Sequence, residues 1–146
     1  MTDNADFRLT AALQDFIEEN NIGNDIKIDA ASKEAYVFFD TGSKFGKLQS
    51  SIQIDENNGY IMIYLIDFQH SIIKDKKSNA LEKINEINLE TKIGCFQLFN
   101  YEDSEYIRFY LGFPADDVSV NETVIYNLFV ECIQAFELRG NDLVNF

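Results

Sequence analysis

Basic residues are scarce in this 146-residue sequence, and their scarcity restricts the possible partners. Lys and Arg total 12 against 25 Asp and Glu, which gives a formal net charge of -13. A surface of this sign repels phosphate backbones and anionic lipid head groups. We therefore expect neither nucleic acid nor a membrane as a partner. The acidity either attracts a basic protein segment or a cationic ligand, or only confers solubility.

Residues that form catalytic and metal sites are also few. His70 is the only histidine, and the two cysteines, Cys95 and Cys132, stand apart inside apolar runs. This leaves no zinc cluster and no Cys-His nucleophile, and we interpret both cysteines as small core residues. The segments 41–48 and 55–59 lack the spacing of a Walker phosphate loop and of a calcium loop. We expect no cofactor, no metal and no enzymatic activity.

Segments that would divide or anchor the chain are missing as well. There is one proline, Pro114, and the sequence has no repeat, no run of 18 apolar residues and no basic, apolar leader at its start. Hydrophobic residues make up 46% of the chain, including 13 Phe and 7 Tyr, which is enough to build a core without disulfides. We expect one domain over residues 1–146 and a cytosolic location.

The spacing of apolar residues alternates between helical and strand periods, which predicts an α+β fold with a mostly antiparallel sheet. Predicted helices cover about 4–21, a segment that begins at Asn79, and a segment from Ser119 to Gly140. Predicted strands cover 25–30, 35–40, 48–55, 60–66, 93–101 and 105–113. The predicted order is therefore α-β-β-β-β-α-β-β-α, with the helices packed on the sheet.

Local signals predict where several of these elements begin and end. Two capping boxes, each a polar residue followed three positions later by Glu, predict helix starts, and two glycines predict helix stops. The boxes are Asn79 with Glu82 and Ser119 with Glu122, and the glycines are Gly23 and Gly140. Asn58-Gly59 predicts a type I′ hairpin turn, and the charged segment 68–77 is interpreted as an exposed loop.

Two strands are apolar on both faces, and a third carries tyrosine and arginine opposite its core side. A face of this kind is either an ordinary solvent face or a contact surface, because Tyr and Arg are enriched where proteins bind each other. The candidate protein-contact residues are Tyr36, Phe38, Tyr60, Met62, Tyr64, Tyr106, Arg108 and Tyr110. The apolar face of the last helix is wider than one sheet requires, which predicts deep burial or a second partner. Together with the apolar strands, this face predicts a homodimer.

Two asparagines occur on or beside the apolar stripe of the middle helix. Asn88 falls on the stripe and Asn85 falls at its edge. An amide against a core needs hydrogen-bond partners. We therefore expect both side chains to bond backbone groups of the adjoining strand or connection.

The segment from Ser78 to Leu138 resembles the YbjN-domain family of bacterial sensory-transduction regulators. The similarity rests on four features: 85–88 (Asn-Glu-Ile-Asn), 93–96 (Ile-Gly-Cys-Phe), 106–109 (Tyr-Ile-Arg-Phe) and the capped last helix. That family is similar in fold to type III secretion chaperones, small acidic proteins that dimerise and hold an extended segment of a client. The resemblance implies this fold and supplies no catalytic residues.

These observations support two functional hypotheses of different classes. The first is a cytosolic, non-enzymatic interaction module with a regulatory or chaperone-like role, which binds a protein client through sheet faces or edges. The second is a small-ligand sensor with a pocket between the helices and the sheet. A lined cavity in the structure is the observation that would keep the second hypothesis open.

Overall fold

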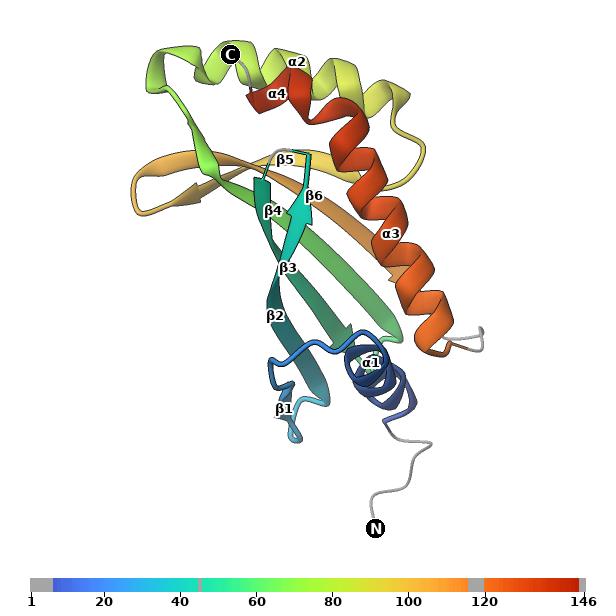
Figure 1. Ribbon diagram of the computed structural model, residues 1–146. Coiled ribbons are helices and arrows are strands. Elements are labelled where there is room, and N and C mark those ends of the chain that lie inside the picture. The colour runs from blue at the N-terminus through green and yellow to red at the C-terminus, as the bar shows by residue number, and fades with distance from the viewer. Residues whose placement is uncertain (1–6, 45, 116–119, 145–146) are drawn as a thin grey trace.

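The computed structural model describes residues 7–44, 46–115 and 120–144. Within these residues the fold is α+β, with one antiparallel sheet and the predicted order of helices and strands (Figure 1). The strands are β1 (Lys27–Asp29), β2 (Glu34–Ser43), β3 (Gly46–Asp55), β4 (Tyr60–Ile72), β5 (Cys95–Tyr101) and β6 (Ser104–Pro114). The helices are α1 (Arg8–Glu19), α2 (Lys77–Glu90), α3 (Glu122–Arg139) and the short α4 (Asn141–Val144), with a 3-10 turn at Lys74–Lys76. The predicted fold class is confirmed.

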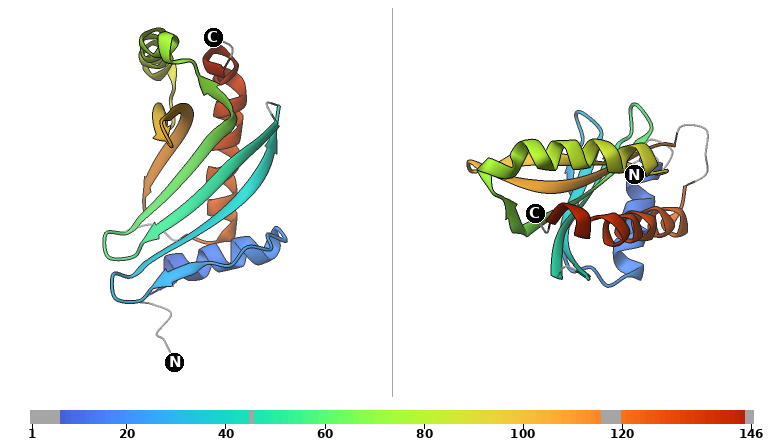
Figure 2. Two further views of the ribbon diagram at one scale, coloured as in Figure 1. Left: turned by 90° about the vertical axis from the view of Figure 1, so that its left-hand side faces the viewer. Right: turned by 90° about the horizontal axis from the view of Figure 1, so that it is seen from above.

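The strands lie in the order β1-β2-β3-β4-β6-β5, and each pairs antiparallel with its neighbours. Because side chains alternate along a strand, the register assigns each residue to one of two faces. Val37, Ile52, Ile63 and Phe109 lie on the face that the helices cover, where all four are buried. Figure 2 shows α1 and α3 on this same side of the sheet. The opposite face is left open.

Two aromatic clusters fill the core under α3. Near its start, Phe129 packs against Phe16 of α1 and Phe39 of β2, with ring centroids 6.0 and 5.3 Å away. Near its end, the Phe136 ring lies 5.7 Å from that of Phe96 in β5. Because α3 crosses the sheet from β2 to β5, it joins both ends of the core.

β4 is longer than predicted. It continues to Ile72, with a register shift between Asp67 and Ile72, so the prediction of an exposed loop from residue 68 is wrong. At this irregularity, fully buried Asp67 accepts a hydrogen bond from the backbone N–H of Gln69 at 2.9 Å. His70 Nδ1 lies 2.8 Å from the other Asp67 carboxylate oxygen. The bulge brings together two side chains that a regular strand would place on opposite faces.

The predicted capping residues need correction. α2 begins at Lys77 without a side-chain cap, and Asn79 lies inside the helix, so no Asn79–Glu82 box forms. α3 is capped by Asn121, whose side chain accepts a hydrogen bond from the Val124 N–H at 3.1 Å. Ser119 lies outside the described residues.

The predicted stop at Gly23 is different in the structure, whereas α3 ends at Gly140 as predicted. After α1, the residue with positive φ is Asn21, at 54°, and Gly23 has none. Gly140 has φ -61° and leads into α4. A Cβ at Gly140 would lie 2.4 Å from the Phe136 carbonyl oxygen. A glycine is therefore required there by close packing.

The turn between β3 and β4 differs from the prediction. Residues 56–59 form a four-residue connection in which Gly59 has φ +66° and Asn58 has no positive φ, so the predicted type I′ turn is wrong. The Asp55 side chain instead accepts a hydrogen bond from the Asn58 N–H at 3.1 Å. A two-residue turn with positive φ at both positions joins β5 and β6, at Glu102 and Asp103.

Candidate binding surfaces

The open face of the sheet carries all the candidate contact residues. The register places them in neighbouring rows, with Tyr64 opposite Tyr110 and Met62 opposite Gly112. Aromatic side chains are exposed at its β2 end, where Phe38 is 46% exposed and its ring centroid lies 5.4 Å from that of Tyr36. The residues on this face are Tyr36, Phe38, Tyr60, Met62, Tyr64, Tyr106, Arg108 and Tyr110.

Arg108 is held in place at the centre of the β4-β6-β5 part of this face. Its guanidinium carbon lies 5.1 Å from the ring centroid of Tyr64 and 4.8 Å from that of Phe99. Its Nε donates a hydrogen bond to Gln97 Oε1 at 2.9 Å. Two cation–π contacts and one hydrogen bond fix the plane of the guanidinium, so its orientation is set before any partner arrives.

Tyr110 is the next residue after Arg108 on the open face of β6. Its ring centroid lies 5.0 Å from that of Tyr64, its partner in β4. Burial, and then repulsion from Tyr64, raises the pKa of Tyr110 above its ordinary value of 10.0.

The outer edge of β5 is covered by α2. Asn88 donates a hydrogen bond from Nδ2 to the Phe96 carbonyl at 3.0 Å, and its Oδ1 accepts one from the Phe96 N–H at 2.8 Å. One side chain thus satisfies both backbone groups of a residue that is 2% exposed. Asn85, by contrast, is exposed on α2, so the expectation that it lies against the core is wrong.

The outer edge of β2 is covered only at its start. β1 pairs with Glu34 to Tyr36, and the Asn24 side chain donates a hydrogen bond to the Phe38 carbonyl. In an antiparallel strand every second residue directs its backbone groups to the same side. Asp40 and Gly42 therefore direct their N–H and C=O groups outward, as Phe38 does. Both are exposed, and no strand lies beyond them within the described residues.

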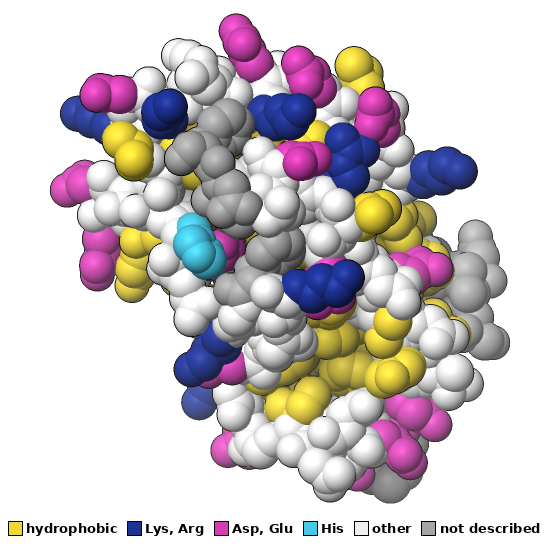
Figure 3. Space-filling model, turned by 45° about the horizontal axis from the view of Figure 1, so that its top comes forward, with side chains coloured by type: hydrophobic (Ala, Val, Ile, Leu, Met, Phe, Trp, Pro, Cys, Tyr) yellow, Lys and Arg dark blue, Asp and Glu magenta, His cyan; other side chains and the backbone are white. Residues whose placement is uncertain are grey.

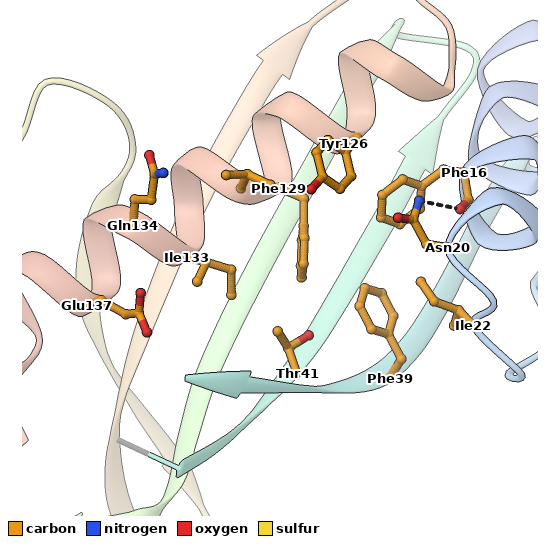
Figure 4. Close-up of a pocket in the computed structure, with 11 residues that line it drawn as sticks. Phe16, Asn20, Ile22, Phe39, Thr41, Tyr126, Phe129, Ile133, Gln134 and Glu137 are labelled. Carbon is orange, nitrogen blue, oxygen red and sulfur yellow. Dashed lines mark hydrogen bonds between the residues drawn. The ribbon is translucent and has the colours of Figure 1, made fainter. Parts of the chain in front are cut away.

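A groove runs beside this open edge, between α1, β2 and α3. Its volume is about 400 Å³, and in Figure 4 Phe39 and Thr41 point from β2 towards Phe129 and Ile133 of α3. Phe16 closes its inner side, and Tyr126, 47% exposed, lies at its rim. Figure 3 shows hydrophobic side chains gathered in a hollow of the surface. Part of the wide apolar face predicted for the last helix thus lines the groove beside the β2 edge.

Acidic residues lie at both ends of the groove. At one end Glu137 lines the groove and accepts a hydrogen bond from the Lys44 N–H at 2.7 Å. At the other end an adjoining hollow is lined by Glu19 and Glu122, together with Tyr126. An apolar centre with acidic ends favours an apolar ligand that carries positive charge at its ends.

The two cysteines differ in environment. Cys132 is fully buried, and burial raises the pKa of its thiol to about 12, as expected for a packing residue. Cys95 is half-buried on the open face opposite Tyr110, so its interpretation as a core residue is wrong. Across the described part of the chain, no three His, Cys, Asp or Glu side chains gather as metal ligands. Likewise, none of the described helices is long and apolar enough to cross a membrane.

The sequence matches no family model and no curated protein. Among solved structures, the fold is similar to that of YbjN from E. coli, described as "a putative transcription regulator". The TM-score is 0.57 and the identity 8%, over 86% of this chain and 84% of that chain. At this identity the likeness shows a YbjN-like fold. Membership of the YbjN-domain family remains a prediction.

The groove is the feature that the sequence did not reveal. Its lining comes from α1, β2 and α3, which lie far apart in the chain. One signal was present, because Val130 and Ile133 widened the apolar face of the last helix beyond what a single sheet needs. The Asp67–His70 contact was also missed, since it depends on the bulge.

Proposed function

We propose that this chain is a non-enzymatic protein-interaction module with a regulatory or chaperone-like role, and that it binds an extended segment of a partner protein along the edge of β2. The observation that carries this proposal is the open backbone at Asp40 and Gly42, directly beside an apolar groove. The fold of YbjN, which is described as a putative transcription regulator, supports a regulatory role by analogy alone.

Strand addition accounts for both parts of this surface. A peptide that pairs with β2 would satisfy its outward N–H and C=O groups, and every second peptide side chain would point into the groove. Beyond the residues that pair with β1, the outer edge of β2 has room for a peptide strand of about five residues, which is roughly 17 Å long. The acidic ends of the groove favour a peptide whose apolar centre is flanked by Lys or Arg.

Self-association and a cytosolic location remain part of the proposal. The surface that we assign to a homodimer contains Leu89 of α2 and Leu138 of α3, which are 88% and 77% exposed. A second cleft, lined in part by Leu138 and Ile93, lies between these helices. Exposed leucines beside a cleft are typical of surfaces that become buried on association.

A small-ligand sensor is the second candidate. The observation that favours it is the groove volume of about 400 Å³, which falls within the range of small-molecule sites. The two candidates differ in their use of β2, because a small ligand would not need the backbone groups of Asp40 and Gly42.

The test uses peptides selected from a phage-displayed random library against the purified protein, with dissociation constants measured by fluorescence anisotropy. In Asp40→Pro the outward N–H is lost while the ladder to β3 is kept, because a proline on an edge strand is tolerated when its nitrogen faces solvent. We expect apolar peptides with basic flanks, bound at least about tenfold more weakly by Asp40→Pro.

Asp40→Asn is the matched control, since it removes the carboxylate but keeps the backbone donor. It should bind the selected peptides as the wild type does. The side chains of Asp40 and Lys47 are both exposed, so the loss of their ion pair should have little effect on stability. Equal binding by Asp40→Pro, or a selection that returns no peptides, would contradict strand addition.

A further inference from the structure

Charge is distributed unevenly between the open face and the rest of the molecule. The chain has 25 acidic residues, yet the open-face positions of the four strands β3 to β6 hold none over 49–53, 60–66, 95–99 and 106–112. Asp40, on β2 next to Gln49, is paired with Lys47 at 3.5 Å. This part of the face combines aromatic and amide side chains with a single cation, Arg108.

Arg108 has no carboxylate partner among the described residues, although acidic side chains are abundant elsewhere. Its interactions are the two rings of Tyr64 and Phe99 and the amide of Gln97. Since only Nε is used by Gln97, the two terminal nitrogens keep the fork that binds a carboxylate bidentately.

We propose that Arg108 is the anchor of a second protein-binding site, which receives one carboxylate of a partner protein while apolar residues of the partner lie on the surrounding rings. The carboxylate belongs to an Asp or Glu side chain or to a chain terminus. This inference rests on the protein-binding function proposed above, and it concerns a surface separate from the β2 edge.

The charge distribution favours a different protein as the partner over a second copy of this chain. A symmetric dimer that set the β4-β6-β5 part of this face against itself would offer Arg108 no carboxylate, and Asp40 on β2 is already paired with Lys47. The net charge of -13 also opposes multiply charged phosphate ligands. A single carboxylate among apolar residues is the ligand that matches one fixed guanidinium and its rings.

The experiment repeats the peptide selection in parallel with the wild type, Arg108→Gln and Lys83→Gln. Lys83, on the surface of α2, gives the same change in charge away from the face. We expect the wild type to enrich peptides with one Asp, Glu or free C-terminal carboxylate among apolar residues. Arg108→Gln should bind these at least about tenfold more weakly, whereas Lys83→Gln should bind them unchanged.

A double-mutant cycle gives the direct readout. Glu→Gln in a selected peptide should weaken binding to the wild type about tenfold and leave binding to Arg108→Gln nearly unchanged. Equal effects in Arg108→Gln and Lys83→Gln, or no enrichment of carboxylates, would overturn the assignment of Arg108. A selection in which every peptide is sensitive to Asp40→Pro and none is sensitive to Arg108→Gln would overturn this inference alone and leave strand addition supported.

Discussion

The two outer edges of the sheet, β5 and β2, differ in how far other parts of the chain cover them. At β5, α2 lies beside the edge, and Asn88 bonds both backbone groups of Phe96. At β2, coverage stops after the short strand β1 and one bond from Asn24, and the edge continues uncovered through Asp40 and Gly42. An uncovered edge invites pairing with another chain, so proteins usually protect it.

This difference indicates that the β5 edge is part of the packed fold, whereas the β2 edge is available to bind another chain. The covered edge has ion pairs that tie α2 to its surroundings, Lys77 with Glu105 in β6 and Arg139 of α3 with Glu90. The uncovered edge has an apolar groove beside it in place of such ties. Three predictions test this contrast, in order of decreasing effect.

The largest effect is expected at Asn88. Asn88→Ala would leave the buried N–H and C=O of Phe96 without partners, which should lower the free energy of unfolding by about 2–3 kcal/mol. Asn85→Ala is the matched control in the same helix, and its effect should stay within about 0.5 kcal/mol because Asn85 is exposed. Urea unfolding measures both. Equal losses in the two variants would show that α2 does not depend on Asn88 to cover the edge.

A smaller effect is expected at the acidic end of the groove. Glu19→Gln with Glu122→Gln should weaken the binding of a basic-flanked peptide about threefold and reduce the dependence of its dissociation constant on salt. The control is Glu82→Gln with Glu86→Gln, which makes the same change in charge on α2. If both double variants reduced the salt dependence equally, only the total charge of the protein would matter.

The smallest effect is expected from pH at the covered edge. A hydrogen bond from Lys77, 3.0 Å away, holds the pKa of Glu105 below its ordinary value of 4.5. A lowered folded-state pKa stabilises the fold above pH 4.5, and this contribution is lost as pH falls below that value. For a single partly exposed pair it is about 0.5 kcal/mol.

Urea unfolding of the wild type and Glu105→Gln checks the pH effect. The wild type should be the more stable at pH 7, and the difference should disappear near pH 3. A constant difference between these two pH values would show that the carboxylate charge of Glu105 does not tie the hairpin to α2.

The sequence predicted those features that depend on neighbouring residues. Strand alternation separated Phe38 from Phe39 and Arg108 from Phe109, and thereby placed the open face correctly. It failed where two signals competed locally, as at Asn121, which caps α3 one position before Glu122. It could not give strand order, and the open edge and its groove depend on that order, because β1 covers only the start of β2.

The central claim is that the edge of β2 is open and accepts a strand. Amide hydrogen exchange, followed by NMR with and without a selected peptide, tests it residue by residue. Without peptide, the Asp40 and Gly42 amides should exchange rapidly, while those of Phe39 and Thr41, directed towards β3, should be protected. With peptide, Asp40 and Gly42 should become protected as well. Protection of these two amides in the free protein, or no change on binding, would contradict the account.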